Sequence, residues 1–258
     1  MRKPFSMKEA PQPQSGNLSG AKPAKATIAQ KEQVQKMFDN IAPSYDLLNH
    51  LLSAGIDKIW RRKVINMIRR QPHQHILDLA TGTGDLAIAA AAALPDTKIT
   101  AVDLSAEMLK YQQIKLDKKN LQERITLLQG DGEALPFADN TFDVVMIAFG
   151  VRNFEDLPKG LAEMHRVLKK DGLVVILEFS KPKTFPVKQL YQFYFTRILP
   201  AVGRWVSKDK SAYSYLPDSV GYFPSGTDFT RYLTQAGFAD PAIKTLTLGI
   251  ASIYSARK

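Results

Sequence analysis

One stretch constrains the fold of this chain more than any other: residues 75–85, which read H-I-L-D-L-A-T-G-T-G-D. Its first half is a short apolar run, typical of a buried parallel strand, and it ends at Gly82 and Gly84. Leu86 then begins an alanine-rich segment with the composition of a helix. Glycines let a ligand approach the backbone, and the start of a helix presents unpaired N–H groups. The sequence therefore predicts a strand, a ligand-binding turn and a helix in succession.

The same alternation of strand and helix continues after this turn. Further apolar runs predict strands, separated by helical patterns, at residues 98–102, 125–129, 142–148 and 173–177, the last preceded by a turn at Lys170–Gly172. Strands separated by helices imply a parallel sheet with right-handed crossovers. Two runs at the C-terminus, 244–248 and 250–256, predict an antiparallel hairpin. We expect an α/β fold, doubly wound around a mostly parallel seven-stranded sheet.

The segments around this pattern suggest how the chain is organised. Residues 1–27 are rich in Pro, Lys, Ser and Gly, a composition that predicts a disordered basic arm. We expect residues 28–258 to form a single domain. Within it, 28–72 should form a helical cap, with Asp57 capping its last helix, and 181–225 should form a helical insertion before the hairpin.

Composition excludes several classes of site. The chain has no cysteine, so it can have no disulfide, thiolate nucleophile or cysteine metal site, and its four histidines show no metal-ligand spacing. No apolar run approaches the roughly 20 residues of a membrane-spanning helix, and no apolar segment follows the basic N-terminus as a secretory signal would. The formal net charge of +10 leaves nucleic acid or anionic lipid open as a partner.

Three predicted strand ends carry residues suited to an adenosine cofactor. The turn with Gly82 and Thr83, together with Asp103 as an acceptor for ribose hydroxyls, would serve a nicotinamide cofactor or S-adenosylmethionine equally well. The acidic loop after the third strand distinguishes between these two cofactors. Asp131 can accept a hydrogen bond from an adenine amino group, and the Gly132 N–H can reach a ring nitrogen. This combination resembles the class I S-adenosylmethionine-dependent methyltransferases.

Four stretches outside these motifs narrow the resemblance: Y-D-L-L-N through to Trp60, F-G-V-R-N at 149–153, R-V-L-K through to E-F-S at 166–180, and Y-S-Y-L through to Pro224. Together they resemble the ubiquinone/menaquinone biosynthesis C-methyltransferase family over residues 31–258. The chain departs from the family pattern at Leu48 and Asp57, where Met and His are usual, at Lys170–Asp171, where Pro-Gly is usual, and at Ala148, where some relatives have a cofactor-contacting Ser.

The resemblance implies methylation of a ring carbon of a polyprenyl quinol, with demethylmenaquinol converted to menaquinol. A benzoquinol of the ubiquinone pathway, or another small molecule, remains an alternative substrate. It also implies that Arg152 and Asn153 are catalytic, with Arg152 stabilising a phenolate or holding a water that takes the proton. The alternative role for Arg152 is a salt bridge to Glu155 or Asp156. Tyr45 and Asn49 would close over the quinol ring, unless they only pack in the core.

The resemblance also bears on partners and location. Residues 186–206 combine many apolar side chains with flanking lysines and arginines, which suits a prenyl tail and an anionic membrane surface, or else a lid helix on the sheet. We expect a cytoplasmic protein in peripheral contact with the inner face of the plasma membrane, and a homodimer is left open. No nucleic-acid partner is expected, because a catalytic Cys and an Asn/Asp-Pro-Pro-aromatic loop are both missing. A nicotinamide dehydrogenase and a non-catalytic scaffold remain rivals.

Overall fold

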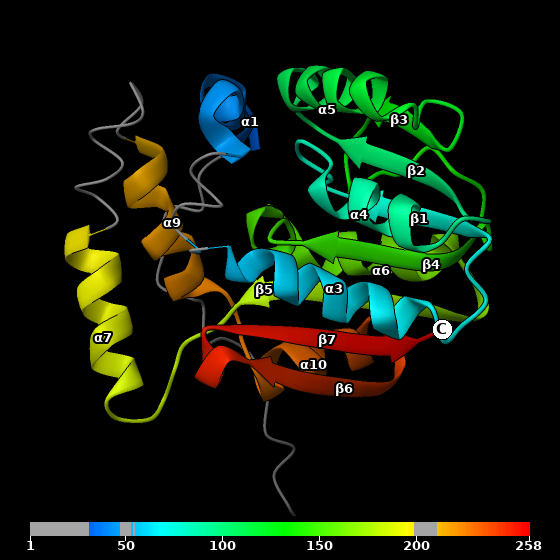
Figure 1. Cartoon of the computed structure of the whole chain (residues 1–258). Coiled ribbons are helices and arrows are strands. Elements are labelled where there is room, and N and C mark those ends of the chain that lie inside the picture. Colours follow the sequence, from blue (N-terminus) through cyan, green and yellow to red (C-terminus); the bar gives the residue numbers. More distant parts are fainter. Residues whose placement is uncertain (1–30, 47–52, 54, 199–210) are drawn as a thin grey trace, which may run out of the picture.

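A mostly parallel sheet, with strand order β3-β2-β1-β4-β5-β7-β6, forms the centre of the computed structural model (Figure 1). The structure describes residues 31–46, 53, 55–198 and 211–258. Its seven strands are β1 (His75–Leu79), β2 (Lys98–Asp103), β3 (Ile125–Gln129), β4 (Phe142–Ala148), β5 (Leu168–Phe179), β6 (Ala239–Leu246) and β7 (Ala251–Arg257). Strands β1 to β5 pair in parallel, whereas β7 pairs antiparallel with both β5 and β6. The predicted fold class and the C-terminal hairpin are therefore confirmed.

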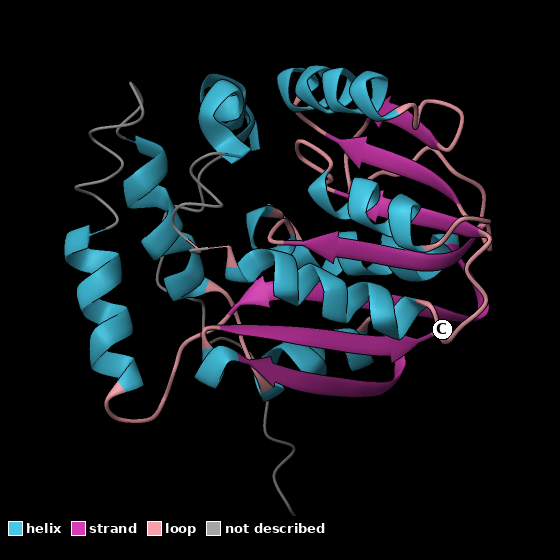
Figure 2. Cartoon of the chain, viewed as in Figure 1, coloured by secondary structure: helices cyan, strands magenta, loops and turns pink. Residues whose placement is uncertain are grey.

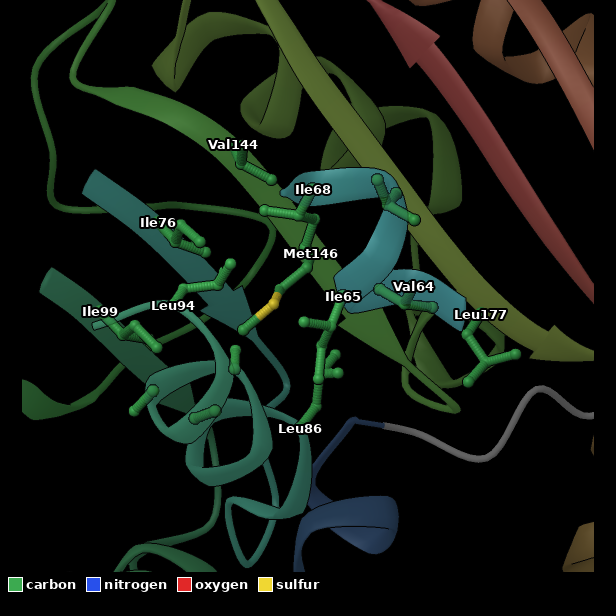
Figure 3. Packing of buried hydrophobic residues seen from close by; sticks show 14 of the residues in the cluster. Val64, Ile65, Ile68, Ile76, Leu86, Leu94, Ile99, Val144, Met146 and Leu177 are labelled. Atoms are coloured by element: carbon green, nitrogen blue, oxygen red, sulfur yellow. The ribbon is translucent and has the colours of Figure 1, made fainter. Parts of the chain in front are cut away.

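Helices cover both faces of the sheet, as Figure 2 shows. The helices that pack on the sheet are α3 (Ile56–Ile68), α4 (Asp85–Ala93), α5 (Ala106–Lys119), α6 (Leu157–Val167) and α10 (Thr227–Gln235). Helices α3, α4 and α5 contribute to one buried apolar cluster, and α6 and α10 contribute to the other. Figure 3 shows the first cluster, in which Ile68 of α3 and Leu86 of α4 lie around Met146 of β4. Apolar side chains on both sides of each central strand explain why the strands read as continuous apolar runs.

The order of the strands places the site. The chain runs outward from β1 through β2 to β3, then returns to add β4 on the other side of β1. In a doubly wound sheet, such a reversal opens a crevice at the carboxyl ends of the strands, where ligands bind. In Figure 1, the arrowheads of β2 and β4 point toward α1 (Lys31–Ile41) and α9 (Ser211–Tyr222). The N-terminal helix and the insertion therefore lie at the edge of the sheet where a ligand is expected.

Two local predictions were wrong. The predicted turn at Lys170–Gly172 lies inside β5, where Asp171 has a φ of 62° and the register with β4 shifts. The residues on both sides of this irregularity still pair with β4, so one strand continues through it. Helix α3 is capped by Gly55 at a φ of 75°, and Asp57 instead lies buried in its first turn. Asp57 accepts a hydrogen bond from Ser53 and pairs with Arg61, which keeps its carboxylate inside the fold.

The two helices of the insertion differ in how far they are buried. The insertion contains α7 (Val187–Phe193), a π-helical turn (Tyr194–Ile198) and α9, and α7 buries none of its residues. Leu190 is 64% exposed and Phe193 is 59% exposed, so one side of α7 is open to solvent. Within the described ranges, no helix has the length and apolar character needed to span a bilayer. The predicted basic arm, Asn49 and Trp205 lie outside these ranges, as do residues 47–52 and 54 of the predicted cap.

Candidate functional site

A cavity of about 1040 Å³, part of it open to solvent, lies at the carboxyl ends of β1, β2, β3 and β4. It brings together most of the predicted site residues: Tyr45, Gly82, Thr83, Asp103, Asp131, Gly132 and Asn153 all line it. Arg152 does not line it, and Asn49 lies outside the described residues. The cavity wall also includes Ala148, at the position where some relatives have a serine.

The glycine turn after β1 has a backbone that other residues rarely adopt. Gly82 has a φ of 58° and Gly84 a φ of 82°. A Cβ added to Gly84 would also come within 2.5 Å of the Gln112 side chain. The turn is tied to the next strand, because the Gly82 N–H donates to Asp103 over 2.7 Å. Glycine is therefore required here both by conformation and by the close approach of α5.

Asp103 organises the end of β2. One carboxylate oxygen accepts the Gly82 N–H, and the other accepts the Ser105 N–H over 2.9 Å. Burial raises the pKa of Asp103 above its ordinary value, although these two backbone bonds oppose the shift. Each carboxylate oxygen has a second lone pair, so Asp103 can hold the turn and still accept bonds from a ribose. Ser105 caps α5 as predicted, accepting the Met108 N–H.

The loop after β3 makes a contact that the sequence did not reveal. Lys31 of α1 pairs with both Asp131 and Glu133, each over 2.8 Å. Partial burial is the largest single influence and works to raise the pKa of Asp131, but the hydrogen bonds from Lys31 and the Glu133 N–H, together with the charge of Lys31, hold that pKa below its usual value. Gly132 lies so close to Phe154 that a Cβ would come within 2.9 Å of the ring. The N-terminal helix thus reaches over the end of the cavity where we expect the adenine.

Thr83 is buried, and its hydroxyl donates to Asp46. Asp46 in turn pairs with Lys115 over 2.6 Å, and Lys115 pairs with Asp85 over 2.7 Å. A chain of charges therefore connects the glycine turn with α5 and the start of α4. Because its hydroxyl hydrogen is donated to Asp46, Thr83 can offer a ligand its backbone and the lone pairs of that oxygen.

Arg152 forms a buried ion pair, but with a different partner from the expected Glu155 or Asp156. Its Nη1 lies 3.0 Å from Glu178, at the end of β5, and the side chains are 6% and 0% exposed. Arg152 also donates to the Phe149 carbonyl and, over 3.3 Å, to the Ser219 hydroxyl. Burial raises the pKa of Glu178 above its ordinary value even against the charge of Arg152.

Aromatic side chains of the insertion converge on this ion pair. The Tyr215 hydroxyl of α9 donates to the Asn153 amide oxygen over 3.0 Å. Burial raises the pKa of Tyr191 on α7, and both Arg152 and Glu178 act on it electrostatically. Asn153 therefore belongs to both the cavity wall and a polar cluster beneath the insertion. Sequence reasoning quoted Glu178 within a motif but did not predict its role, since its partner lies 26 positions away.

Asp78 lies deeper in the cavity, inside β1. It is 1% exposed, and burial raises its pKa to about 7. The Thr81 hydroxyl donates to it over 2.7 Å. A positive charge beside a buried carboxylate stabilises its ionised form. The cavity therefore offers a place for a positively charged ligand group next to the glycine turn.

Sequence comparison identifies relatives along nearly the whole chain. Residues 26–258 match the model of the ubiE/COQ5 methyltransferase family. A demethylmenaquinone methyltransferase of Bacteroides fragilis is 48% identical over 227 residues, covering 88% of this chain and 93% of the relative. A ubiquinone/menaquinone biosynthesis C-methyltransferase, UbiE, of Geotalea daltonii is 48% identical over 228 residues, covering 88% and 97%. The similarity includes both the cavity loops and the insertion.

Solved structures share the fold at low identity. A putative S-adenosyl-L-methionine-dependent methyltransferase of Methanococcus maripaludis is 21% identical, with a TM-score of 0.57, and the match covers 93% of this chain and 97% of that one. The [4+2]-cyclase SpnF is 15% identical, with a TM-score of 0.63, and the match covers 88% and 96%. Because a cyclase shares this fold, the fold alone does not choose an activity.

Proposed function

Because the chain belongs to the ubiE/COQ5 methyltransferase family, we propose that it transfers a methyl group from S-adenosylmethionine to a ring carbon of a polyprenyl quinol. The substrate supported best is demethylmenaquinol, since the Bacteroides fragilis relative is named for that reaction. A benzoquinol is the second candidate, because the Geotalea daltonii relative is named for both quinone pathways. The observation that carries the proposal is the cavity, which joins three acidic or glycine-rich strand ends to Asn153.

The residues of the cavity fit the cofactor. Asp131 and Gly132 would hold the adenine, Asp103 the ribose, and the Gly82–Thr83 backbone the amino-acid part. Asp78, with its pKa near 7, suits a positively charged group beside the turn. When bound, S-adenosylmethionine supplies a methyl group on a positively charged sulfur. The Asp131 carboxylate already accepts a hydrogen bond from Lys31. The adenine amino group would therefore bind to the same carboxylate beside Lys31 or in its place.

The acceptor side lies beyond Asn153. There the chain must hold the quinol ring, orient its carbon and remove a proton, so positioning contributes much of the rate. Asn153 is fixed by the Tyr215 hydroxyl and faces the cavity, which suits a residue that orients the ring. Arg152 is held by Glu178 behind the cavity wall, next to Asn153, and from there its positive charge would stabilise a developing phenolate. Tyr45 lines the cavity near Gly82 and would cover the ring from the opposite wall.

We also propose that the insertion contacts the membrane surface, where a prenyl tail stays in lipid. Exposed Leu190 and Phe193 stand on α7, next to the exposed basic residues Lys183, Lys188 and Arg197. Each basic side chain near an anionic surface adds about 1 kcal/mol, and salt screens the attraction. Co-sedimentation should therefore be stronger with anionic than with neutral vesicles and should weaken as salt rises.

The double variant Leu190→Ser, Phe193→Ser should sediment less while keeping its melting temperature, because both side chains are exposed. Ile114→Ser, which removes an exposed apolar side chain from α5, is the matched control and should sediment like wild type. Equal and negligible sedimentation on both vesicle types would reject the membrane contact.

The function itself is tested in cells that lack the gene. Their quinone pool, analysed by mass spectrometry, should accumulate the quinone without the ring methyl, and the wild-type gene should restore the methylated form. An unchanged quinone pool would reject the proposal.

Calorimetry with S-adenosylmethionine and with NADH distinguishes a methyltransferase from a dehydrogenase, since only S-adenosylmethionine should bind.

A further inference from the structure

Arg61 on α3 is a buried cation whose Nε finds no hydrogen-bond partner among the described residues. The residue is 7% exposed and lines the cavity. Its Nη1 is held by Asp57, one turn earlier on the same helix. Its Nη2 lies 3.5 Å from Asp85, which is longer than the usual distance of a hydrogen-bonded ion pair. The guanidinium is thus anchored at Nη1, while the edge that carries Nε and Nη2 is only weakly engaged.

Arg61 lies at the glycine-turn end of the cavity. Asp85 is the first residue of α4, directly after Gly84. Strand β1, which leads into this turn, is separated by β2 from β3, whose end carries Asp131. The other positively charged residue in the described wall, Lys31, is bound to Asp131 and Glu133 at that opposite end. A negative ligand group near the glycine turn would therefore have Arg61 as its cation.

The geometry points to Arg61 as the ligand of the α-carboxylate of S-adenosylmethionine, an assignment that rests on the proposed function. The Nε and Nη2 edge of a guanidinium matches a carboxylate in a planar, bidentate pair. Asp78 and Asp85 line the same end of the cavity and suit the ammonium group, but they would repel a carboxylate without a cation between them. Anchoring by Asp57 keeps the guanidinium in place before the ligand arrives, which lowers the entropy cost of binding.

A purely structural role for Arg61, as a tie between α3 and α4, makes a different prediction. If Arg61 is only structural, its replacement should weaken the binding of every molecule in the cavity equally. If Arg61 binds the carboxylate, its replacement should weaken only the binding of molecules that carry a carboxylate. Decarboxylated S-adenosylmethionine keeps the adenosine, sulfonium and amine, and it therefore isolates this one group.

Calorimetry should find that wild-type protein prefers S-adenosylmethionine over the decarboxylated form by about 10- to 150-fold, as expected for a bond between charged groups. In Arg61→Gln, the affinity for S-adenosylmethionine should fall by about the same factor, while the decarboxylated form changes less than about threefold. Arg62→Gln, which removes an exposed guanidinium from the next position of α3, is the matched control and should bind both ligands like wild type.

Removing Arg61 leaves Asp57 buried without its cation, so a second variant, Asp57→Asn with Arg61→Gln, removes both charges and keeps the test valid if the single variant unfolds. Equal losses for the two ligands, or no loss for either, in a folded variant would overturn the assignment. Failure of the proposed function looks different, because wild-type protein would then bind neither ligand.

Discussion

Replacing Arg152 with methionine should lower the free energy of unfolding by about 3–5 kcal/mol, because the change leaves a buried carboxylate without its cation. Glu178 is fully buried, and its pKa is already raised by burial in the presence of Arg152. Without the guanidinium, the folded protein must protonate Glu178 or bury an uncompensated charge. Urea unfolding, followed by circular dichroism at neutral pH, measures the loss.

The double variant Arg152→Met, Glu178→Gln should recover most of that stability, since neither charge then remains. If the single variant Arg152→Met unfolded within about 1 kcal/mol of wild type, that result would contradict the buried ion pair.

Arg152→Lys keeps the charge but loses the planar fork that reaches Glu178, Ser219 and the Phe149 carbonyl. It should lower kcat and leave cofactor affinity intact, and an unchanged kcat would remove Arg152 from the mechanism.

Asp103→Ala should cost the cofactor about 1.5–3 kcal/mol of binding energy for each hydrogen bond that its ribose makes to the carboxylate. The variant also loses the acceptor that ties the Gly82 N–H to β2, so the turn itself becomes less ordered. Both effects weaken binding in the same direction. Titration calorimetry with S-adenosylhomocysteine measures the change.

Asp103→Asn separates these effects, because an amide oxygen can still accept one of the two backbone N–H groups. It should keep the wild-type melting temperature more closely than alanine does and still bind the cofactor more weakly than wild type. If Asp103→Ala bound the cofactor as tightly as wild type, the ribose assignment would be wrong.

The sequence predicted the sheet well because each central strand is buried on both faces and therefore reads as an apolar run. The ends of such runs coincide with β3 and β4, at Ile125–Gln129 and Phe142–Ala148. The prediction was wrong at Lys170–Gly172, where the polar residues of a turn lie within β5. A strand can include residues typical of a turn when the residues before and after them pair with the same neighbouring strand. Only the pairing register with β4 reveals this.

The cavity residues were predictable for the same reason, since the carboxyl ends of neighbouring parallel strands meet at one edge. Their partners were not. Lys31 reaches Asp131 from 100 positions away, and Arg152 pairs with Glu178 across 26. Such contacts leave no periodicity in the sequence, because they depend on how α1 and β5 pack. Arg61 gave no signal either, as its position facing Asp85 arises from the packing of α3 on α4.

Methyl transfer by the purified protein tests the central claim most directly. The protein is incubated with S-adenosylmethionine carrying a trideuterated methyl group, and with demethylmenaquinol or the corresponding benzoquinol kept reduced. We predict that mass spectrometry finds one deuterated methyl group on a ring carbon of the quinol, with S-adenosylhomocysteine formed in equal amount and the naphthoquinol preferred. Tight binding of the cofactor without any label on either quinol would contradict the account.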